Sequence, residues 1–139
     1  MKKIIVLALI SLLILTGCHN KLIGDVSNVR IFDNDIEFNL VKNSLTRTSV
    51  SIIMKNNSDK TLYYGTPYEI EVFHDGVWKK MNIEMFFTMP LIELDPGKEI
   101  KLDFDWKYTH GKLKGKYRII KSVYFEKENE FYIGCEFTI

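Results

Sequence analysis

Residues 68–81 read YEIEVFHDGVWKKM and carry a sharp signal of β structure. Asp75-Gly76 separates two short runs, and this dipeptide is typical of the two-residue type I′ turn because both of its positions need positive φ. A turn of this type fixes how the two strands pair. The predicted cross-strand partners are His74 with Val77, Phe73 with Trp78, Val72 with Lys79, and Glu71 with Lys80.

The hairpin register assigns the side chains to two faces, since neighbours along a strand point in opposite directions. The pairs Glu71–Lys80 and Phe73–Trp78 share one face, where cross-strand ion and ring pairs are favourable. The opposite face is expected to be the core side. It carries Ile70, Val72, Val77 and Met81.

Alternation with period two continues along the chain, and no stretch keeps a helical period beyond two turns. Residues 100–107 show it most cleanly, because Ile100, Leu102, Phe104 and Trp106 alternate with charged residues, as in a half-buried strand. Further strands are predicted at residues 26–32, 36–41 and 46–55, from residue 115 onward, and at residues 131–139.

Turns by composition separate these strands, for example at Asn56 to Lys60 and at Asp95-Pro96-Gly97. Seven or eight short strands with such spacing predict a single antiparallel β-sandwich, an all-β fold. Tyr117 stands at a strand start, where a tyrosine corner places its ring. We expect Tyr117 to be buried, with its hydroxyl bonded to backbone in the loop preceding its strand, near His110 to Lys112.

Several of these turns and strand starts resemble a family of bacterial immunoglobulin-like domains found in lipoproteins. The motifs are Asn56-Asn57-Ser58-Asp59 before Tyr63-Tyr64-Gly65, then Gly76-Val77-Trp78, Leu94-Asp95-Pro96-Gly97-Lys98, and Leu113-Lys114-Gly115-Lys116-Tyr117-Arg118-Ile119. The resemblance covers residues 27–139 and implies an immunoglobulin-like sandwich. It implies no catalytic or ligand-binding residues, and sandwich folds host many functions.

The N-terminus resembles that of bacterial lipoproteins. Lys2-Lys3 precede an apolar run from Ile4 to Leu15, as in a secretory signal, and the run is too short for an ordinary membrane span. Leu15-Thr16-Gly17-Cys18 resembles the lipobox, which implies cleavage before Cys18 and a diacylglycerol on its sulfur. The alternatives are a plain secretory signal and an uncleaved anchor, but bulky Leu15 departs from a small-x-small cleavage site.

The predicted domains are a cleaved signal-peptide helix at residues 1–17, a lipidated tether at residues 18–26 and the sandwich at residues 27–139. Two acyl chains on Cys18 suffice for stable anchoring. We therefore expect the mature chain at the extracytoplasmic face of the cell membrane. A composition rich in Lys, Ile, Asn and Tyr is typical of AT-rich coding and favours a Gram-positive bacterium.

Charge and cysteine content exclude some classes of partner and bond. The chain has 19 Lys and Arg against 18 Asp and Glu, and loss of Lys2 and Lys3 with the signal leaves a net charge near −1. No basic patch suited to nucleic acid stands out. With Cys18 lipidated, Cys135 is left alone, so no intramolecular disulfide is expected.

The histidines and acidic clusters do not predict a metal site. His19, His74 and His110 are scattered, without the short spacing of zinc ligands. Asp33-Asn34-Asp35 with Glu37 lacks the glycine and the closing acid of a calcium loop, so it is interpreted as a solvated turn.

The remaining reactive side chains do not predict catalysis either. Asp103 and Asp105 face outward on a solvated strand. Cys135 shares an apolar face with Ile133 and Phe137, where burial makes a thiol unreactive. The sequence therefore predicts no cofactor, no metal and no enzyme activity.

Aromatic side chains give the one lead toward function. Phe73 and Trp78 project from one hairpin face, and Phe86 and Phe87 belong to an unusually apolar connection at residues 85–91. Exposed, these four would form a contact patch for a protein, a glycan or a membrane. In the alternative, the connection folds over one end of the sandwich and Trp78 fills the core.

Together these features predict a non-enzymatic lipoprotein, held at the membrane through Cys18, that is a protein-interaction or structural module at the cell envelope. The alternative is a lipoprotein that binds a small ligand or a cell-wall fragment. Binding lipoproteins of that kind are ordinarily larger and two-lobed, but an aromatic-lined pocket would favour this alternative.

Overall fold

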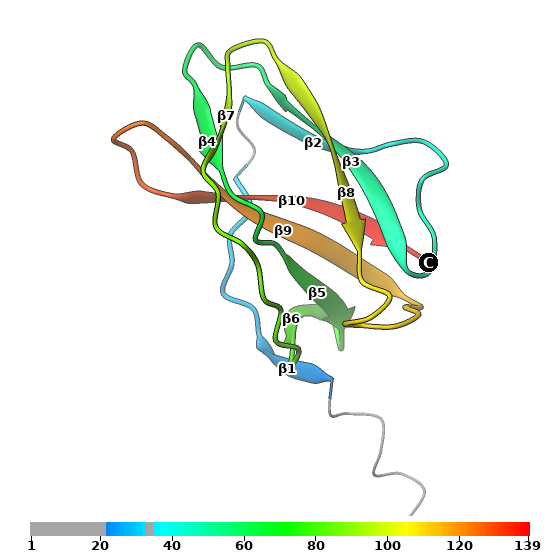
Figure 1. Ribbon diagram of the computed structural model, residues 1–139. Coiled ribbons are helices and arrows are strands. Elements are labelled where there is room, and N and C mark those ends of the chain that lie inside the picture. Colours follow the sequence, from blue (N-terminus) through cyan, green and yellow to red (C-terminus); the bar gives the residue numbers. More distant parts are fainter. Residues whose placement is uncertain (1–21, 33–34) are drawn as a thin grey trace, which may run out of the picture.

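The computed structural model describes residues 22–32 and 35–139, and this part of the chain is all β. Its ten strands form two antiparallel sheets in a sandwich-like arrangement (Figure 1). The signal peptide predicted at residues 1–17, Cys18 and residues 19–21 lie outside the described residues, as do Asp33 and Asn34.

The larger sheet has seven strands in the order β1-β6-β5-β9-β4-β7, with β10 paired to β9. These strands are β1 (Ile23–Val26), β4 (Leu62–Tyr64), β5 (Glu69–His74), β6 (Val77–Met81), β7 (Ile92–Leu94), β9 (Lys116–Phe125) and β10 (Phe131–Thr138). The smaller sheet has the order β2-β3-β8. It consists of β2 (Ile36–Leu40), β3 (Ser49–Asn56) and β8 (Glu99–Asp105).

The β5–β6 hairpin has the predicted register. His74 pairs with Val77, and the other three predicted pairs follow in step. Asp75 and Gly76 have φ values of 53° and 79°, as a type I′ turn requires. Because the turn is local, this register could be predicted from the dipeptide alone.

The prediction of seven or eight strands is too low, because three short strands were missed. β4 and β7 have three residues each, too few to show a period. Residues 23–26, which were assigned to the tether, form β1 along the edge of β6. The prediction of a strand at residues 26–32 is wrong. Beyond Val26, the described residues of this range form a single isolated β-bridge, from Ile31 to Tyr132.

The core lies between the two sheets. The period-two alternation over residues 46–55 predicts one face with Val50, Ile52 and Met54, and this face and the apolar face of Ile133, Cys135 and Phe137 are confirmed as buried. Trp106, directly after β8, is fully buried; its ring stacks on Phe137 with centroids 5.6 Å apart, and its Nε1 donates to the Arg47 carbonyl at 3.0 Å. The buried residues of β3 and β10 are Val50, Ile52, Met54, Asn56, Ile133, Cys135 and Phe137. Trp106, not Trp78, is therefore the core tryptophan.

Tyr117 is buried and its hydroxyl bonds to backbone in the loop preceding β9, as predicted, but the partner lies nearer to the strand than expected. The hydroxyl donates to the Lys114 carbonyl at 3.3 Å, not to residues 110–112. The backbone amides of Thr109, His110 and Gly111 instead fold back onto the carbonyl of Trp106. Because these bonds hold residues 109–111 beside the end of β8, the Tyr117 hydroxyl bonds to a carbonyl later in the loop, that of Lys114.

Residues 27–31, here called the crossing segment, pass over the outer face of the larger sheet. At one end the Ser27 amide donates to Trp78 on β6, and at the other Ile31 bridges to Tyr132 on β10. β5 and β9 lie between these two strands, so the segment must cross them (Figure 1). Gly134 permits this approach, since a Cβ there would lie 2.8 Å from Cδ1 of Ile31.

Candidate interaction surface

A buried ion pair lies on the outer face of the larger sheet, beneath the crossing segment. Arg118 donates from Nε and Nη2 to Oε2 of Glu71, at 2.8 and 2.6 Å. The side chains are 9% and 1% exposed, and the Ser27 hydroxyl donates to the other carboxylate oxygen, Oε1. Both oxygens of this buried carboxylate therefore accept a hydrogen bond from a side chain that is distant in the sequence.

The surface pair Glu71–Lys80 expected from the hairpin is wrong as an ion pair. Lys80 is the register partner of Glu71 on β6, but it is exposed, whereas Glu71 is buried. Arg118 is the register partner on the other side, on β9. Because the crossing segment covers Glu71, the carboxylate pairs with the partner that can be buried with it.

Four side chains form what we call the aromatic–cation surface: Phe73, Trp78, Lys116 and Arg118. The Phe73 and Trp78 rings meet at 5.2 Å and 62°. The Arg118 guanidinium lies 4.6 Å from the centroid of Trp78. Lys116 Nζ lies 4.8 Å from the Phe73 centroid and 5.5 Å from that of Trp78, and it also pairs with Glu136 at 3.3 Å.

This arrangement presents a partly exposed aromatic pair on a rigid base. Phe73 is 39% exposed and Trp78 is half-buried, so neither fills the core. Arg118 connects the rings to Glu71, on the two central strands β5 and β9. Ring–cation stacking of this kind orders the side chains before any partner arrives, which lowers the entropy cost of binding.

The predicted four-residue patch is divided by the structure. Phe73 contacts Trp78, whereas Phe87 packs on Tyr68, with ring centroids 5.2 Å apart. Phe86 is 91% exposed. Phe87 thus folds against the sandwich, as in the alternative of a covering connection, although Trp78 does not fill the core. Phe86, Phe73 and Trp78 remain accessible at least in part, as a contact patch requires.

A cavity of about 340 Å³ lies between the start of β5 and the connection that follows β6. Its polar lining includes Glu69, Lys80 and His110, and burial holds the pKa of His110 below its ordinary value. The Thr109 Oγ1 and the His110 Nδ1 form a hydrogen bond of 2.8 Å. The apolar lining includes Tyr68, Ile70, Met81, Ile83, Met85, Phe87 and Ile120.

Lys121 is a buried cation that the sequence analysis missed. Its Nζ donates to the carbonyls of Gly65 and Pro67 and lies 5.3 Å from the centroid of the Tyr64 ring. β9 changes partner here from β5 to β4, so the amine satisfies carbonyls at the junction. Burial lowers its pKa to about 8. The sequence did contain a signal for this burial: Lys121 is two residues after Ile119, so both side chains point to the same, core-facing side of the strand.

The other reactive side chains considered from the sequence, Cys135 and Asp103, do not belong to the aromatic–cation surface. Cys135 is buried, as expected, and burial raises the pKa of its thiol to about 11. Asp103 accepts from Ser51 at 2.5 Å, which helps hold its pKa below the ordinary value. Over residues 22–32 and 35–139, no three His, Cys, Asp or Glu side chains are grouped to hold a metal ion. Nor does a helix of the length and apolar character needed to cross a bilayer occur in these ranges.

The sandwich and its sequence motifs define the class of protein. Residues 33–134 match the family of bacterial Ig-like domains, so the chain belongs to that family. Such domains are structural or interaction modules and are generally non-enzymatic.

Similarity beyond the family is weak. No curated protein is significantly similar in sequence. One similar solved structure is a protein from Archaeoglobus fulgidus, 12% identical, covering 76% of this chain and 96% of that chain with a TM-score of 0.29. A score at this level supports no argument about fold or function.

Proposed function

We propose that this chain is a lipid-anchored, non-enzymatic Ig-like module at the extracytoplasmic face of the cell membrane, where it binds an envelope protein. The aromatic–cation surface carries the proposal. It presents Trp78 beside Phe73, and tryptophan is one of the residue types that most often dominate binding energy at protein interfaces, while the buried Arg118 supports the Trp78 ring from below. Its residues also lie on the neighbouring paired strands β6, β5 and β9, which hold its geometry.

The chemistry of the surface indicates what the partner presents. The charge of Arg118 is neutralised by Glu71, while Lys116 is exposed between the two rings. An apolar side chain placed on Phe73 and Trp78, with a carboxylate beside it, would satisfy both features. We therefore propose a partner protein that inserts an apolar anchor flanked by Asp or Glu.

Site-specific crosslinking in intact cells tests this partner. A photoreactive phenylalanine analogue at position 73 should give one discrete protein adduct, and Trp78→Ala should remove most of it. The matched control is the analogue at Tyr108, an aromatic residue that is 90% exposed on a different loop. No adduct at position 73, an equal adduct at position 108, or substrate turnover by the purified chain would contradict the proposal.

The anchor has its own test, because Cys18 lies outside the described residues. The support is the lipobox Leu15-Thr16-Gly17-Cys18. Cys18→Ala should block incorporation of labelled palmitate and leave an uncleaved precursor or a released protein, whereas Cys135→Ala should keep the label. Label in the Cys18 variant, or a mature N-terminus other than Cys18, would refute lipidation.

A second candidate function, small-ligand or wall-fragment binding, rests on the cavity of about 340 Å³, a volume within the range of ligand sites. A ligand at a hundredfold its Kd should stabilise the purified chain by about 2.7 kcal/mol. Ile83→Arg places a charge in the cavity and should abolish that gain, whereas Glu84→Arg, at the next exposed position, should keep it. A ligand panel without any thermal shift would count against this function.

A further inference from the structure

The start of the described chain is clamped against the connection that follows β6. The Asn82 amide donates to the Leu22 carbonyl at 2.9 Å, and Ile23 pairs with Met81. We call residues 82–91 the β6–β7 connection. Figure 1 shows this connection leaving from beside β1 and running up to β7. Leu22 and the first residues of the connection therefore meet at one point on the sandwich.

The first part of the connection alternates between two environments. Met81, Ile83, Met85 and Phe87 are half-buried, whereas Asn82, Glu84 and Phe86 are exposed. Phe86 thus points away from the sandwich and is 91% exposed. The same end of the molecule exposes Leu22 and Val26, at 51% and 61%. Exposed large apolar side chains on two segments that are bonded to one another are typical of a contact surface.

Chain length identifies what can cover this surface. Cys18 is four residues from Leu22, so its Cα lies no more than about 14 Å from that of Leu22. Phe86 is four residues from Asn82 and subject to the same limit. A lipid on Cys18 therefore holds the Leu22–Asn82 end of the sandwich close to the bilayer surface, within reach of Phe86.

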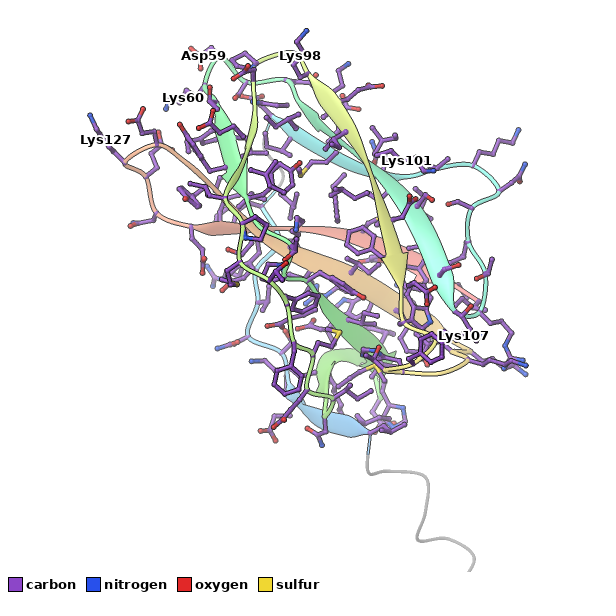
Figure 2. The ribbon with its side chains drawn as sticks, viewed as in Figure 1. Asp59, Lys60, Lys98, Lys101, Lys107 and Lys127 are labelled. Carbon is purple, nitrogen blue, oxygen red and sulfur yellow. The ribbon has the colours of Figure 1, made fainter. Side chains whose placement is uncertain are left out.

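We propose that the β6–β7 connection is a second membrane contact, in which Phe86 inserts into the interfacial region of the bilayer beside Leu22 and Val26. This contact rests on the proposed lipid anchor. Phe and Leu are among the side chains that interfacial segments bury at the boundary between headgroups and acyl chains. Two contacts orient the sandwich, with the end that carries Asp59 and Lys98 directed away from the membrane; Figure 2 labels both residues at the end opposite β1.

Depth-dependent quenching in vesicles tests the contact with the full lipidated chain. Glu84→Cys carries an environment-sensitive thiol probe next to Phe86, and Asp59→Cys carries the same probe at the far end. The native Cys135 thiol is buried, so it does not compete for the label. The vesicles contain phosphatidylglycerol and phosphatidylethanolamine with brominated acyl chains. Quenching at position 84 should exceed quenching at position 59 several-fold, and Phe86→Ser should remove most of that difference.

Each failure has a distinct readout. Retention on vesicles through an alkaline wash reports the anchor by itself. A retained chain with equal quenching at positions 84 and 59 overturns the membrane contact and leaves the anchor intact. A chain that washes off overturns both. Phe86→Ser should not change unfolding in urea, and a clear loss of stability would overturn the proposal by showing that Phe86 packs on the sandwich.

Discussion

Arg118 on β9 lies directly opposite Glu71 on β5 and holds one of its carboxylate oxygens through two nitrogens. The two residues are 47 positions apart in the chain and almost completely buried. Glu71 also has Lys80 as a cross-strand neighbour on β6. Glu71 is bonded from the crossing segment by Ser27, and Arg118 is stacked on the Trp78 ring, so both members of this pair are buried whereas Lys80 is exposed.

Breaking this pair should be far more damaging than removing the exposed alternative. Glu71→Gln leaves the Arg118 charge buried without its carboxylate, so we expect a loss of about 3–5 kcal/mol in urea unfolding. Lys80→Met should change stability by no more than about 0.5 kcal/mol. The double variant Glu71→Leu with Arg118→Leu should recover part of the loss. Equal effects of Glu71→Gln and Lys80→Met would contradict the assignment.

The tyrosine hydroxyl at the start of β9 should make a modest contribution. Tyr117→Phe keeps the buried ring and removes the bond to the Lys114 carbonyl. We expect a loss of about 1 kcal/mol in the free energy of unfolding. Tyr108→Phe, at an exposed ring, is the matched control and should be neutral. A Tyr117→Phe variant as stable as the parent would show that the bond contributes nothing.

Asn56 should be among the most sensitive polar positions. Its side-chain nitrogen donates to the carbonyls of Lys60 and Leu94, both at 2.8 Å, and its oxygen accepts from the Ser58 amide at 3.0 Å. Asn56→Ala leaves these carbonyls and the Ser58 amide without their hydrogen-bond partner at a buried site. The free energy of unfolding, measured by chemical denaturation, should fall by about 2–4 kcal/mol. Asn57→Ala, at an exposed neighbour, should cost much less. Similar losses in both variants would contradict this role.

Lys121 should make stability rise with pH in alkaline solution. Its pKa is lowered by burial from 10.5 to about 8 in the folded chain. Between these values the unfolded chain binds more protons than the folded chain, so raising the pH favours folding. Within that window, Lys121 makes the free energy of unfolding rise with pH by up to about 1.4 kcal/mol per pH unit. Below about pH 8 the lysine is protonated in both states and causes no such slope.

Lys121→Met removes this titration and provides the comparison. The difference in free energy of unfolding between parent and variant should shift in favour of the parent from pH 8 to pH 10. Taking the difference cancels the titration of tyrosines, which both proteins share. Parallel profiles would show that the Lys121 ammonium keeps its ordinary pKa.

Local features could be predicted because their physical causes lie within a few residues. The type I′ turn at Asp75-Gly76 sets the hairpin register through two positive φ values, whatever surrounds it. Strict alternation in β3 and β10 identified buried faces, since side chains repeat with period two. Residues of this kind, together with the turn motifs, were sufficient for an all-β sandwich of the bacterial Ig-like family.

The sequence by itself therefore determined the buried faces of β3 and β10, the hairpin register and the class of fold. The tertiary structure decided which hairpin, polar and aromatic residues are covered, and Val77, expected on the core side, is 39% exposed. Trp78 and Trp106 both lie in alternating stretches, yet only Trp106 is in the core. Glu71 is buried because a segment from another part of the chain crosses it, and Lys121 because β9 changes partner there. These outcomes depend on pairings between distant strands, which no local period encodes.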